Sequence, residues 1–178
     1  IIPVDSEHYS ISQLIQNKRK NEIEKIFLTA SGGPFLNYKI SQFKNVRPND
    51  ALAHPKWKMG KKITIDSSTL LNKVFELIEA QKIFNLPPNK FEIIIHPNSL
   101  VHAIVKYKNG LIKFMYHETT MIIPLANAIF DGKLLIKEFY KVHDKKKNFD
   151  GFPDLIFKKP DQKIFPIIKI IKRVNEYP

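Results

Sequence analysis

The sequence contains no cysteine, and only three of its 29 basic residues are arginines. Without cysteine the chain can form neither a disulfide framework nor a thiolate metal site, which is compatible with a reducing compartment. A long apolar run is also missing, since the longest candidate, residues 121–130, is interrupted by a proline and an asparagine. A membrane helix needs roughly 18 or more apolar residues. We therefore predict that the chain has no membrane-spanning segment and no membrane partner.

The shortage of arginine bears on the net charge of +12, which would otherwise suggest a nucleic-acid partner. Proteins that read base edges, or that bind phosphates in bidentate fashion, rely on arginine. Here the only arginines are Arg19, Arg47 and Arg173. We therefore expect no nucleic acid among the partners, and we interpret the positive charge as an attraction for a small anionic substrate.

The amino-terminus has no methionine, no basic segment and no small-residue cleavage site, so no signal peptide is visible. Its abrupt start on Ile1-Ile2-Pro3 looks like a position inside a longer protein. The composition, 43% hydrophobic and 26% charged, is ordinary for a globular domain. We predict a catalytic domain over residues 1–140, a lysine- and proline-rich linker over 141–163, and the start of a C-terminal helical region over 164–178.

Apolar periodicity predicts the secondary structure. The clearest helix runs from about residue 67 to 84, with one apolar stripe and with Asn72, Glu76 and Glu79 on the other side. Further elements are expected as helices within 10–26, 121–130 and 165–174, strands at 26–29, 62–66, 91–95, 100–107 and 111–116, a hairpin turn at 108–110 and an irregular segment at 37–62. This mixture predicts an α+β fold: a mixed sheet with helices on one face, followed by an extended linker and a truncated C-terminal helical segment.

Three carboxylates form the first candidate site. Asp5 and Glu7 stand two residues apart, so both would project to the same side if residues 1–4 form a strand. Glu76, on the predicted helix, is the candidate third member. Carboxylate oxygens suit a hard divalent ion such as Mg²⁺ or Mn²⁺, and three converging carboxylates without a cation would repel one another. The sequence therefore predicts a metal-dependent active site.

Two serine-containing segments are candidate phosphate sites. Residues 31–33 (Ser-Gly-Gly) follow a predicted strand and could offer backbone N–H groups to an anion, although the same residues would also make a plain turn. Ser67 and Ser68 stand where the best helix is expected to begin, so its free N–H groups could bind an anion within reach of Asn72 and Lys73. Simple capping of the helix is the alternative for these two serines.

Residues 54–60 are expected to form a loop. It contains the single tryptophan of the chain, Trp57, with a proline before it and a glycine after it. Such a loop could close over a substrate and exclude water, although a tryptophan that anchors the loop to the core is an equal alternative. His96 and His102 lie at the ends of predicted strands, where we expect structural roles. His8 and Glu79 are expected to support the metal ligands or the helix surface rather than to bind the ion.

Several blocks of the sequence resemble the 1-deoxy-D-xylulose 5-phosphate reductoisomerase family, in the same order and spacing. They extend over nearly the whole chain and comprise residues 2–8 (IPVDSEH), 28–35 (LTASGGPF), 54–63 (HPKWKMGKKI), 66–73 with Glu76 (DSSTLLNK) and 95–99 (IHPNS), with a weaker echo in residues 155–166. Two positions depart from the pattern. Val74 stands where the family commonly has glycine, and residues 119–122 (TTMI) replace its Pro-Asp-Met-Arg.

The resemblance implies an oxidoreductase and isomerase that uses NADPH and a divalent ion. It would rearrange and reduce the sugar phosphate to 2-C-methyl-D-erythritol 4-phosphate in non-mevalonate isoprenoid biosynthesis. It implies metal ligation by Asp5, Glu7 and Glu76, and catalytic roles for Glu7, Lys73 and His54. Substrate contacts would come from Ser6, Ser31, His54, Trp57, Ser67, Asn72 and Lys73, and nicotinamide contacts from Met59, Gly60 and Met121. The NADPH-binding half would precede Ile1.

The same resemblance implies a homodimer in the full-length enzyme, and a location in the bacterial cytoplasm or in a plastid-type organelle. A second hypothesis is a decayed or repurposed domain that keeps this fold without turnover, supported only by Val74 and Ile122. Nucleic-acid binding through the basic charge ranks third.

Overall fold

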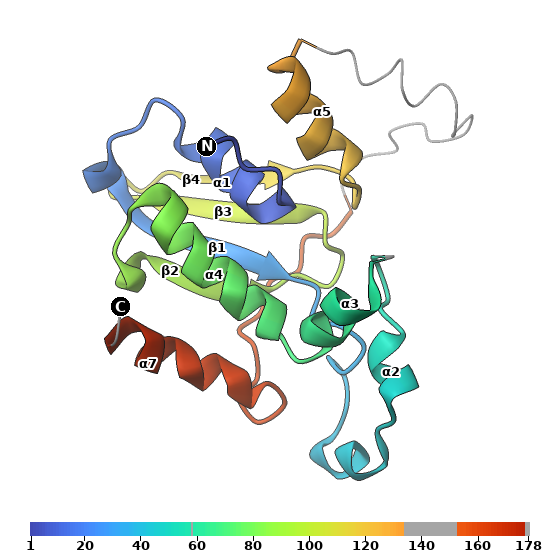
Figure 1. The fold of residues 1–178 in the computed structure, drawn as a ribbon. Helices are drawn as coiled ribbons and strands as arrows, with labels where there is room; N and C mark the ends of the chain where they lie inside the picture. Colours follow the sequence, from blue (N-terminus) through green and yellow to red (C-terminus); the bar gives the residue numbers. More distant parts are fainter. Residues whose placement is uncertain (58, 134–152, 177–178) are drawn as a thin grey trace.

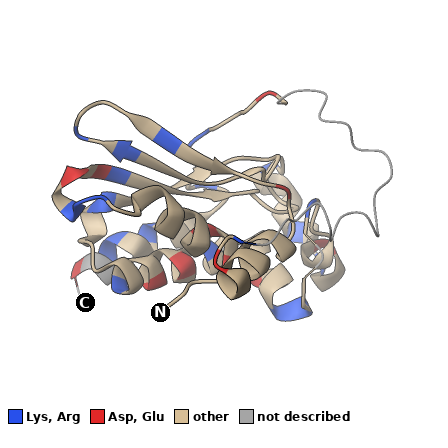
Figure 2. Ribbon diagram, turned by 90° about the horizontal axis from the view of Figure 1, so that it is seen from above, with Lys and Arg blue, Asp and Glu red and all other residues tan. Residues whose placement is uncertain are grey.

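The computed structural model describes residues 1–57, 59–133 and 153–176. In these residues a four-stranded sheet is covered on one face by the helices α1 (Ser6–Ile15), α4 (Leu71–Phe84) and α7 (Ile170–Glu176) (Figures 1 and 2). Two shorter helices, α2 (Pro48–Leu52) and α3 (Lys61–Ser68), lie beyond the end of the central strand (Figure 1). The predicted mixed sheet with helices on one face is confirmed.

The sheet has the strand order β2-β1-β3-β4. Its strands are β1 (Ile23–Ala30), β2 (Phe91–Ile95), β3 (Val101–Tyr107) and β4 (Ile112–Tyr116). The central β1 pairs parallel with β2 and antiparallel with β3, which continues into β4 through the predicted hairpin turn. Because β1 and β3 run in opposite directions, the end of β1 lies beside the start of β3. Polar residues at the end of β1 and at the start of β3 therefore lie close together, at one end of the strands.

The core lies between the sheet and the covering helices. Ile26 and Leu28 of β1 are fully buried, and they pack with Ile11 of α1 and with Val74 and Leu77 of α4. Burial of each such aliphatic side chain contributes roughly 1.5–3 kcal/mol. This packing fixes α1 and α4 against the sheet, and those two helices carry the predicted metal ligands.

The described residues form five further elements. They are α5 (Ile122–Phe130), as predicted from residues 121–130, and the 3-10 helices η1 (Lys20–Glu22), η2 (Ile40–Asn45), η3 (Pro88–Lys90) and η4 (Pro166–Lys169). The expected irregular segment 37–62 thus contains η2 and α2, and the helix expected within 10–26 is α1, which starts and ends earlier. No helix of the described residues is both long and apolar enough to cross a membrane.

Three predictions of local structure were wrong. Residues 1–4 form no strand; instead the carboxylate of Asp5 caps α1 by accepting the N–H groups of Glu7 and His8, each at 3.1 Å. Residues 62–66 are not a strand but lie in α3, where Lys62 and Asp66 form an i, i+4 ion pair at 2.7 Å. Their β-branched residues suggested a strand, but β propensity is weak without pairing partners.

The third error concerns the helix expected from about residue 67. Ser67 and Ser68 end α3, and α4 begins only at Leu71. The break lies at Leu70, whose φ of 65° is left-handed and cannot continue a right-handed helix. Leu70 is nonetheless 2% exposed, so the packing of its side chain holds it in this unfavourable conformation.

The C-terminal segment returns to the sheet. Ile95, at the end of β2, exchanges backbone hydrogen bonds of 2.8 and 3.0 Å with Lys158, and Phe165 is buried against the core. The expected final helix is present as η4 and α7. Most of the predicted linker, and therefore the boundary at residue 140, lies outside the described residues. The division at 140 and 163 stays a prediction.

Candidate active site

The amino-terminus of α1 positions the first two carboxylates. Asp5 accepts two backbone N–H groups of the first turn, and this turn also carries Glu7. A helix start favours negative charge, because its free N–H groups and dipole present a partial positive charge. Asp5 and Glu7 therefore come to the same side through a helix cap, not through the strand expected from their spacing.

Glu76 comes from α4 and is 6% exposed. The imidazole of His8 ties the two helices together, since its Nε2 lies 2.8 Å from the backbone oxygen of Glu76 and its Nδ1 3.6 Å from Asp5. The His8 contact with Glu76 thus goes to the backbone, leaving the Glu76 carboxylate free of His8. Glu79 lies at the edge, 61% exposed in its side chain and 4.0 Å from His8.

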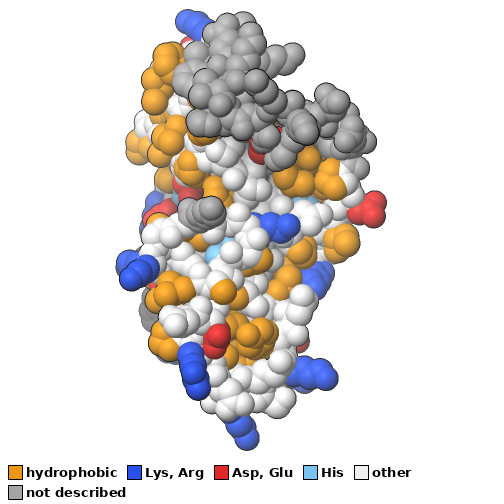
Figure 3. Space-filling view, turned by 90° about the vertical axis from the view of Figure 1, so that its right-hand side faces the viewer, with side chains coloured by type: hydrophobic (Ala, Val, Ile, Leu, Met, Phe, Trp, Pro, Cys, Tyr) orange, Lys and Arg blue, Asp and Glu red, His pale blue; other side chains and the backbone are white. Residues whose placement is uncertain are grey.

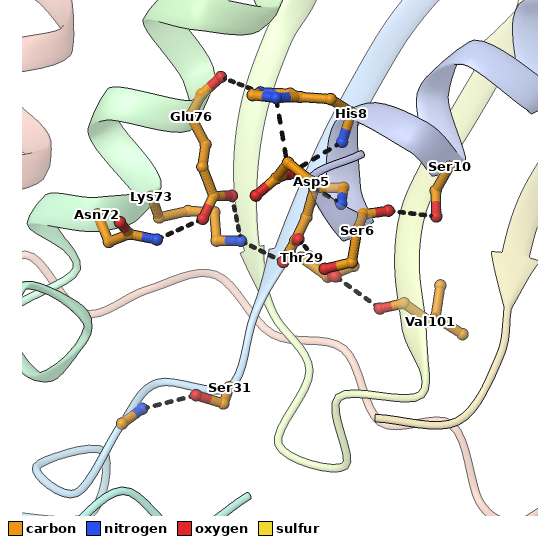
Figure 4. Close-up of polar contacts among 12 residues, drawn as sticks. Asp5, Ser6, His8, Ser10, Thr29, Ser31, Asn72, Lys73, Glu76 and Val101 are labelled. Carbon is orange, nitrogen blue, oxygen red and sulfur yellow. Dashed lines mark hydrogen bonds and ion pairs between the residues drawn. The ribbon is translucent and has the colours of Figure 1, made fainter. Parts of the chain in front are cut away.

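The carboxylates of Asp5, Glu7 and Glu76 converge, since each offers an oxygen within 4.8 Å of the others. Figure 4 shows Asp5 and Glu76 reaching toward each other from α1 and α4, beside Lys73. The ammonium of Lys73 lies between two of them, 2.5 Å from Glu7 Oε1 and 2.5 Å from Glu76 Oε2. Asn72 Nδ2 donates to the other oxygen of Glu76, and Ser6 Oγ donates to Glu7. One ammonium among three carboxylates leaves excess negative charge, and the oxygen donors fit a hard divalent cation.

Burial and mutual repulsion perturb this cluster strongly. Burial, with the charge of Glu7, raises the pKa of Asp5, and the same two causes raise the pKa of Glu76 well above its usual range. Burial also disfavours the charge of Glu7, but Lys73 overcomes it and holds the pKa of Glu7 at about 2. Burial alone would lower the pKa of Lys73, yet the surrounding carboxylates raise it. A bound cation would replace protons on the carboxylates.

These carboxylates line a cavity of about 640 Å³, and Ser31, which lines the same cavity, lies well away from Asp5 and Glu76 at its other end (Figure 4). All but one of the residues predicted to bind substrate or nicotinamide line the same cavity. They are Ser6, Ser31, His54, Trp57, Met59, Ser67, Asn72, Lys73 and Met121. The exception is Gly60, which is the N-cap residue of α3. Figure 3 looks onto the side that carries α2 and α3, where apolar side chains lie interspersed with Lys and Arg. The predicted residues that line the cavity thus come from five separate parts of the sequence.

Ser31 follows the last residue of β1 and links two loops. Its Oγ accepts the N–H of Gly33 at 3.1 Å and lies 3.1 Å from Nε2 of His54. The other ring nitrogen, Nδ1, accepts the N–H groups of Lys56 at 3.2 Å and of Trp57 at 2.8 Å. Nδ1 therefore carries no hydrogen, and neutral His54 donates its Nε2–H to Ser31. Burial lowers the pKa of His54, which favours this neutral form.

The second predicted phosphate segment needs correction. Ser67 and Ser68 lie at the C-terminal end of α3, so the positive helix end expected there is absent. Ser67 still lines the cavity, whereas Ser68 is 1% exposed and its Oγ donates to Ile65 at 2.7 Å. The helix start lies instead at Leu71, and α4 has no side-chain cap. Asn72 and Lys73 belong to that first turn itself.

His102 was not predicted as a site residue. It lies on β3, is 2% exposed, and lines the cavity with its ring edge-on to Trp57, at 6.2 Å between ring centroids. The other side of its ring stacks on His117 at 3.7 Å, and its Nε2 lies 3.2 Å from the backbone oxygen of His117. Burial lowers the pKa of His102 to about 4. The antiparallel pairing of β1 and β3 places His102 near the end of β1, and no local sequence pattern reveals that pairing.

Comparison with known proteins shows how far this arrangement is shared. A family profile described as the 1-deoxy-D-xylulose 5-phosphate reductoisomerase C-terminal domain matches residues 1–84. The 1-deoxy-D-xylulose 5-phosphate reductoisomerase of Pelagibacter ubique is 51% identical over 98% of this chain and 44% of the relative. The enzyme of the same name from Persephonella marina is 43% identical over 99% of this chain and 46% of the relative. The chain thus spans less than half the length of these relatives.

Solved structures give the same result. A crystal structure of DOX-P reductoisomerase with NADPH, fosmidomycin and magnesium has a TM-score of 0.84 and 35% identity over 99% of this chain and 44% of that one. The enzyme from Zymomonas mobilis in complex with NADPH has a TM-score of 0.82 and 32% identity, again over 99% of this chain and 44% of that one. Sequence and fold agree along nearly the whole chain.

Proposed function

Because the chain belongs to the 1-deoxy-D-xylulose 5-phosphate reductoisomerase family, we propose that it is the metal- and substrate-binding portion of such an enzyme. The enzyme would use NADPH and a divalent ion to rearrange and reduce the sugar phosphate to 2-C-methyl-D-erythritol 4-phosphate. One observation carries the proposal: the carboxylates Asp5, Glu7 and Glu76 converge at one end of the cavity that Ser31 and Ser67 also line. The nicotinamide donor would be held largely by the part of the relatives that this chain does not span.

Asp5, Glu7 and Glu76 would hold Mg²⁺ or Mn²⁺, and a relative's structure contains magnesium. A bound divalent ion supplies charge stabilisation for an alkoxide and polarises a carbonyl. The chain's own residues prepare the site. His8 joins α1 to α4 through the backbone of Glu76, and Asn72 and Ser6 orient the carboxylates of Glu76 and Glu7.

The phosphate of the substrate would lie toward Ser31, Ser67, Asn72 and Lys73. Ser6 and Asn72 would contact its hydroxyl and carbonyl groups. Lys73, whose pKa is raised by the carboxylates, keeps its ammonium charge and so offers a fixed cation beside Glu7 and Glu76. Phosphate binding remote from the reacting carbons supplies energy for positioning.

The loop of residues 54–60 would cover the substrate. His54 holds its proton at Nε2 toward Ser31, and Trp57 adds an apolar wall that excludes water beside His102. Met59, Gly60 and Met121 would lie near the nicotinamide, and two of these three line the cavity. Glu7, Lys73 and His54 would be the catalytic residues.

The alternative of a decayed domain gains little support from the two departures. Val74 is 2% exposed and packs in the hydrophobic core, and Ile122 is 46% exposed at the start of α5. Neither residue belongs to the lining of the cavity. The change of residue at these positions therefore leaves the proposed ligands in place.

Metal binding tests the site directly. We expect the chain to bind Mn²⁺ in a calorimetric titration, and Glu76→Gln to weaken that affinity about tenfold or more. Glu92→Gln is the matched control, because Glu92 lies in a surface ion pair with Lys25. Equal Mn²⁺ affinity in Glu76→Gln and the control would contradict the assigned ligands.

Turnover separates the enzyme from the decayed domain. We would join the chain to the amino-terminal portion of the Pelagibacter ubique enzyme and follow NADPH oxidation with 1-deoxy-D-xylulose 5-phosphate. Oxidation that depends on Mn²⁺ and stops with fosmidomycin supports the proposal. A joined protein that binds Mn²⁺ and NADPH but never oxidises NADPH favours decay.

Two narrower proposals concern partners and place. We propose a homodimer in the full-length enzyme, supported by Ile112 and Phe114 on the outermost strand β4, which are 60% and 48% exposed. Sedimentation of the full-length enzyme at monomer mass would contradict this.

The bacterial relatives favour a bacterial cytoplasm over a plastid-type organelle. Figure 2 shows Lys and Arg of the described residues spread over strands and helices, so that within those residues no single element gathers the basic charge.

A further inference from the structure

Two loops meet behind the proposed phosphate pocket. Gly33 has a left-handed φ of 62°, and a Cβ built on it would lie 3.1 Å from the backbone oxygen of Ser67 and 3.1 Å from Cα of Ser68. Contacts this short are tighter than most real Cβ contacts, so one of the two backbones would have to move. The absence of a side chain at Gly33 therefore permits the loop after β1 to touch the end of α3.

The end of α3 has little freedom to retreat. The backbone oxygen of Ser67 accepts the N–H of Leu70 at 3.1 Å, and Leu70 is buried with its own left-handed backbone. Ser68 is 1% exposed and hydrogen-bonded to Ile65. A side chain at position 33 would consequently displace the loop that contains it rather than the helix end.

Displacement of that loop would reach the cavity through Ser31. The N–H of Gly33 donates to Ser31 Oγ at 3.1 Å, and the same Oγ accepts the proton of His54 Nε2 at 3.1 Å. Ser31 and Ser67 both line the cavity, whereas Gly33 does not. Gly33 thus lies between the two serines without reaching the ligand space itself.

We propose that Gly33 is a positioning residue that sets the spacing between Ser31 and Ser67 and so tunes the affinity of the cavity for a phosphate group. The inference rests on the proposed phosphate pocket. The inference adds that one wall of this pocket is fixed by contact of Gly33 with the backbone of Ser67 and Ser68. A methyl group at position 33 would move Ser31 away from Ser67. The carboxylate cluster, held by α1 and α4, does not depend on this contact.

Three glycine-to-alanine variants of the full chain test this. The nearest atoms to a Cβ built on Gly33 are backbone atoms, those nearest to one on Gly32 (φ 86°) are side-chain atoms of Leu36, and Gly110 (φ 86°) has nothing within 4 Å of the built Cβ. All three replacements place a Cβ on a backbone of positive φ, and Gly110→Ala does so without any close contact, so it controls for backbone strain. Inorganic phosphate and Mn²⁺ would be titrated separately, and folding monitored by circular dichroism.

We expect Gly33→Ala to weaken phosphate affinity about tenfold, Gly32→Ala less and Gly110→Ala hardly at all, with Mn²⁺ affinity unchanged in each. In a Ser31→Ala background, Gly33→Ala should add little further loss, because it acts through Ser31. Equal phosphate affinity in Gly33→Ala and Gly110→Ala overturns the inference but leaves the proposed function standing. Failure of the unmodified chain to bind phosphate overturns both.

If Gly33→Ala does not fold, the backbone amide NMR signals of the unmodified chain are followed during a phosphate titration instead. Phosphate should shift the Gly33 and Ser67 signals together, with one affinity. A titration that moves Ser67 alone contradicts the proposed coupling.

Discussion

The two ends of the cavity are built differently. The carboxylate end comes from two helices that pack on the sheet, with Glu76 and Lys73 each 6% exposed. The end near Ser31 includes a loop in which Pro55, Lys56 and Gly60 are exposed. His54 hydrogen-bonds there to Ser31 and to the backbone N–H of Trp57, whose ring meets His102 edge-on. The proposed metal end is therefore preorganised by the core, whereas the loop proposed as the cover depends on a few local contacts. Each prediction below bears on one of these ends.

The largest effect is expected from Lys73→Met, which removes the ammonium between Glu7 and Glu76. Breaking a buried ion pair by deleting one partner costs about 3–5 kcal/mol of unfolding free energy. Urea denaturation at neutral pH measures the loss, and added Mn²⁺ should restore part of it. Lys106→Met is the control, because its pair with Glu24 is about 40% exposed and contributes under about 1 kcal/mol. Equal losses in the two variants would refute a preorganised metal end.

A second large effect is a dependence of stability on pH through His102, whose buried ring meets Trp57 edge-on. Its pKa is about 4 in the folded chain and 6.5 when unfolded, so the unfolded state binds the proton more tightly. This contribution is fully present above pH 6.5 and is lost as the pH falls toward 4. We expect a loss of about 3 kcal/mol over that range, relative to His102→Asn. Parallel pH profiles of the two proteins would contradict it.

An intermediate effect is expected at Val74, which lies on α4 behind the metal end. Val74→Ala should lower the unfolding free energy by about 2 kcal/mol, through lost burial and the cavity left behind. Mn²⁺ affinity should stay within about twofold, because the side chain packs into the core and does not line the site. A marked gain or loss of Mn²⁺ affinity would show that this departure from the family pattern acts on the ligands.

The smallest effect on stability is expected at the cover. His54→Ala removes the contact with Ser31 and the acceptor for the N–H of Trp57, at a cost of about 1 kcal/mol of unfolding free energy. Fosmidomycin affinity, by calorimetry, should fall about tenfold while Mn²⁺ affinity stays unchanged. Lys56→Ala, an exposed neighbour, is the control. Loss of Mn²⁺ affinity in His54→Ala would show that the two ends are not independent.

Prediction from the sequence was most accurate where a local pattern is compatible with only one secondary structure. The hairpin at 108–110, the strands around it and the helix from 122 followed from periodicity and turn residues. It was weakest at the junction of α3 and α4, where an apolar helical pattern runs through a break. Leu70 has no sequence feature that favours φ of 65°. Only packing between the two helices and the sheet selects that conformation.

His102 illustrates the other limit. Nothing local distinguishes it from His96, which is fully buried and stacks on Phe157 outside the cavity lining. Both histidines stand near strand ends, and only the strand order decides which one faces the cavity. A contact between residues far apart in the sequence depends on that order, which periodicity does not contain.

The sequence by itself determined the chemical types: three carboxylates, a lysine and two serine segments in an order that resembles one family. Tertiary structure decided how they meet. Asp5 and Glu7 converge through a helix cap and not a strand, Glu76 reaches them across α1 and α4, and Gly33 packs against the end of α3. The reason is physical, because ligand types are properties of single residues, whereas distances between them arise from packing of the core that connects them.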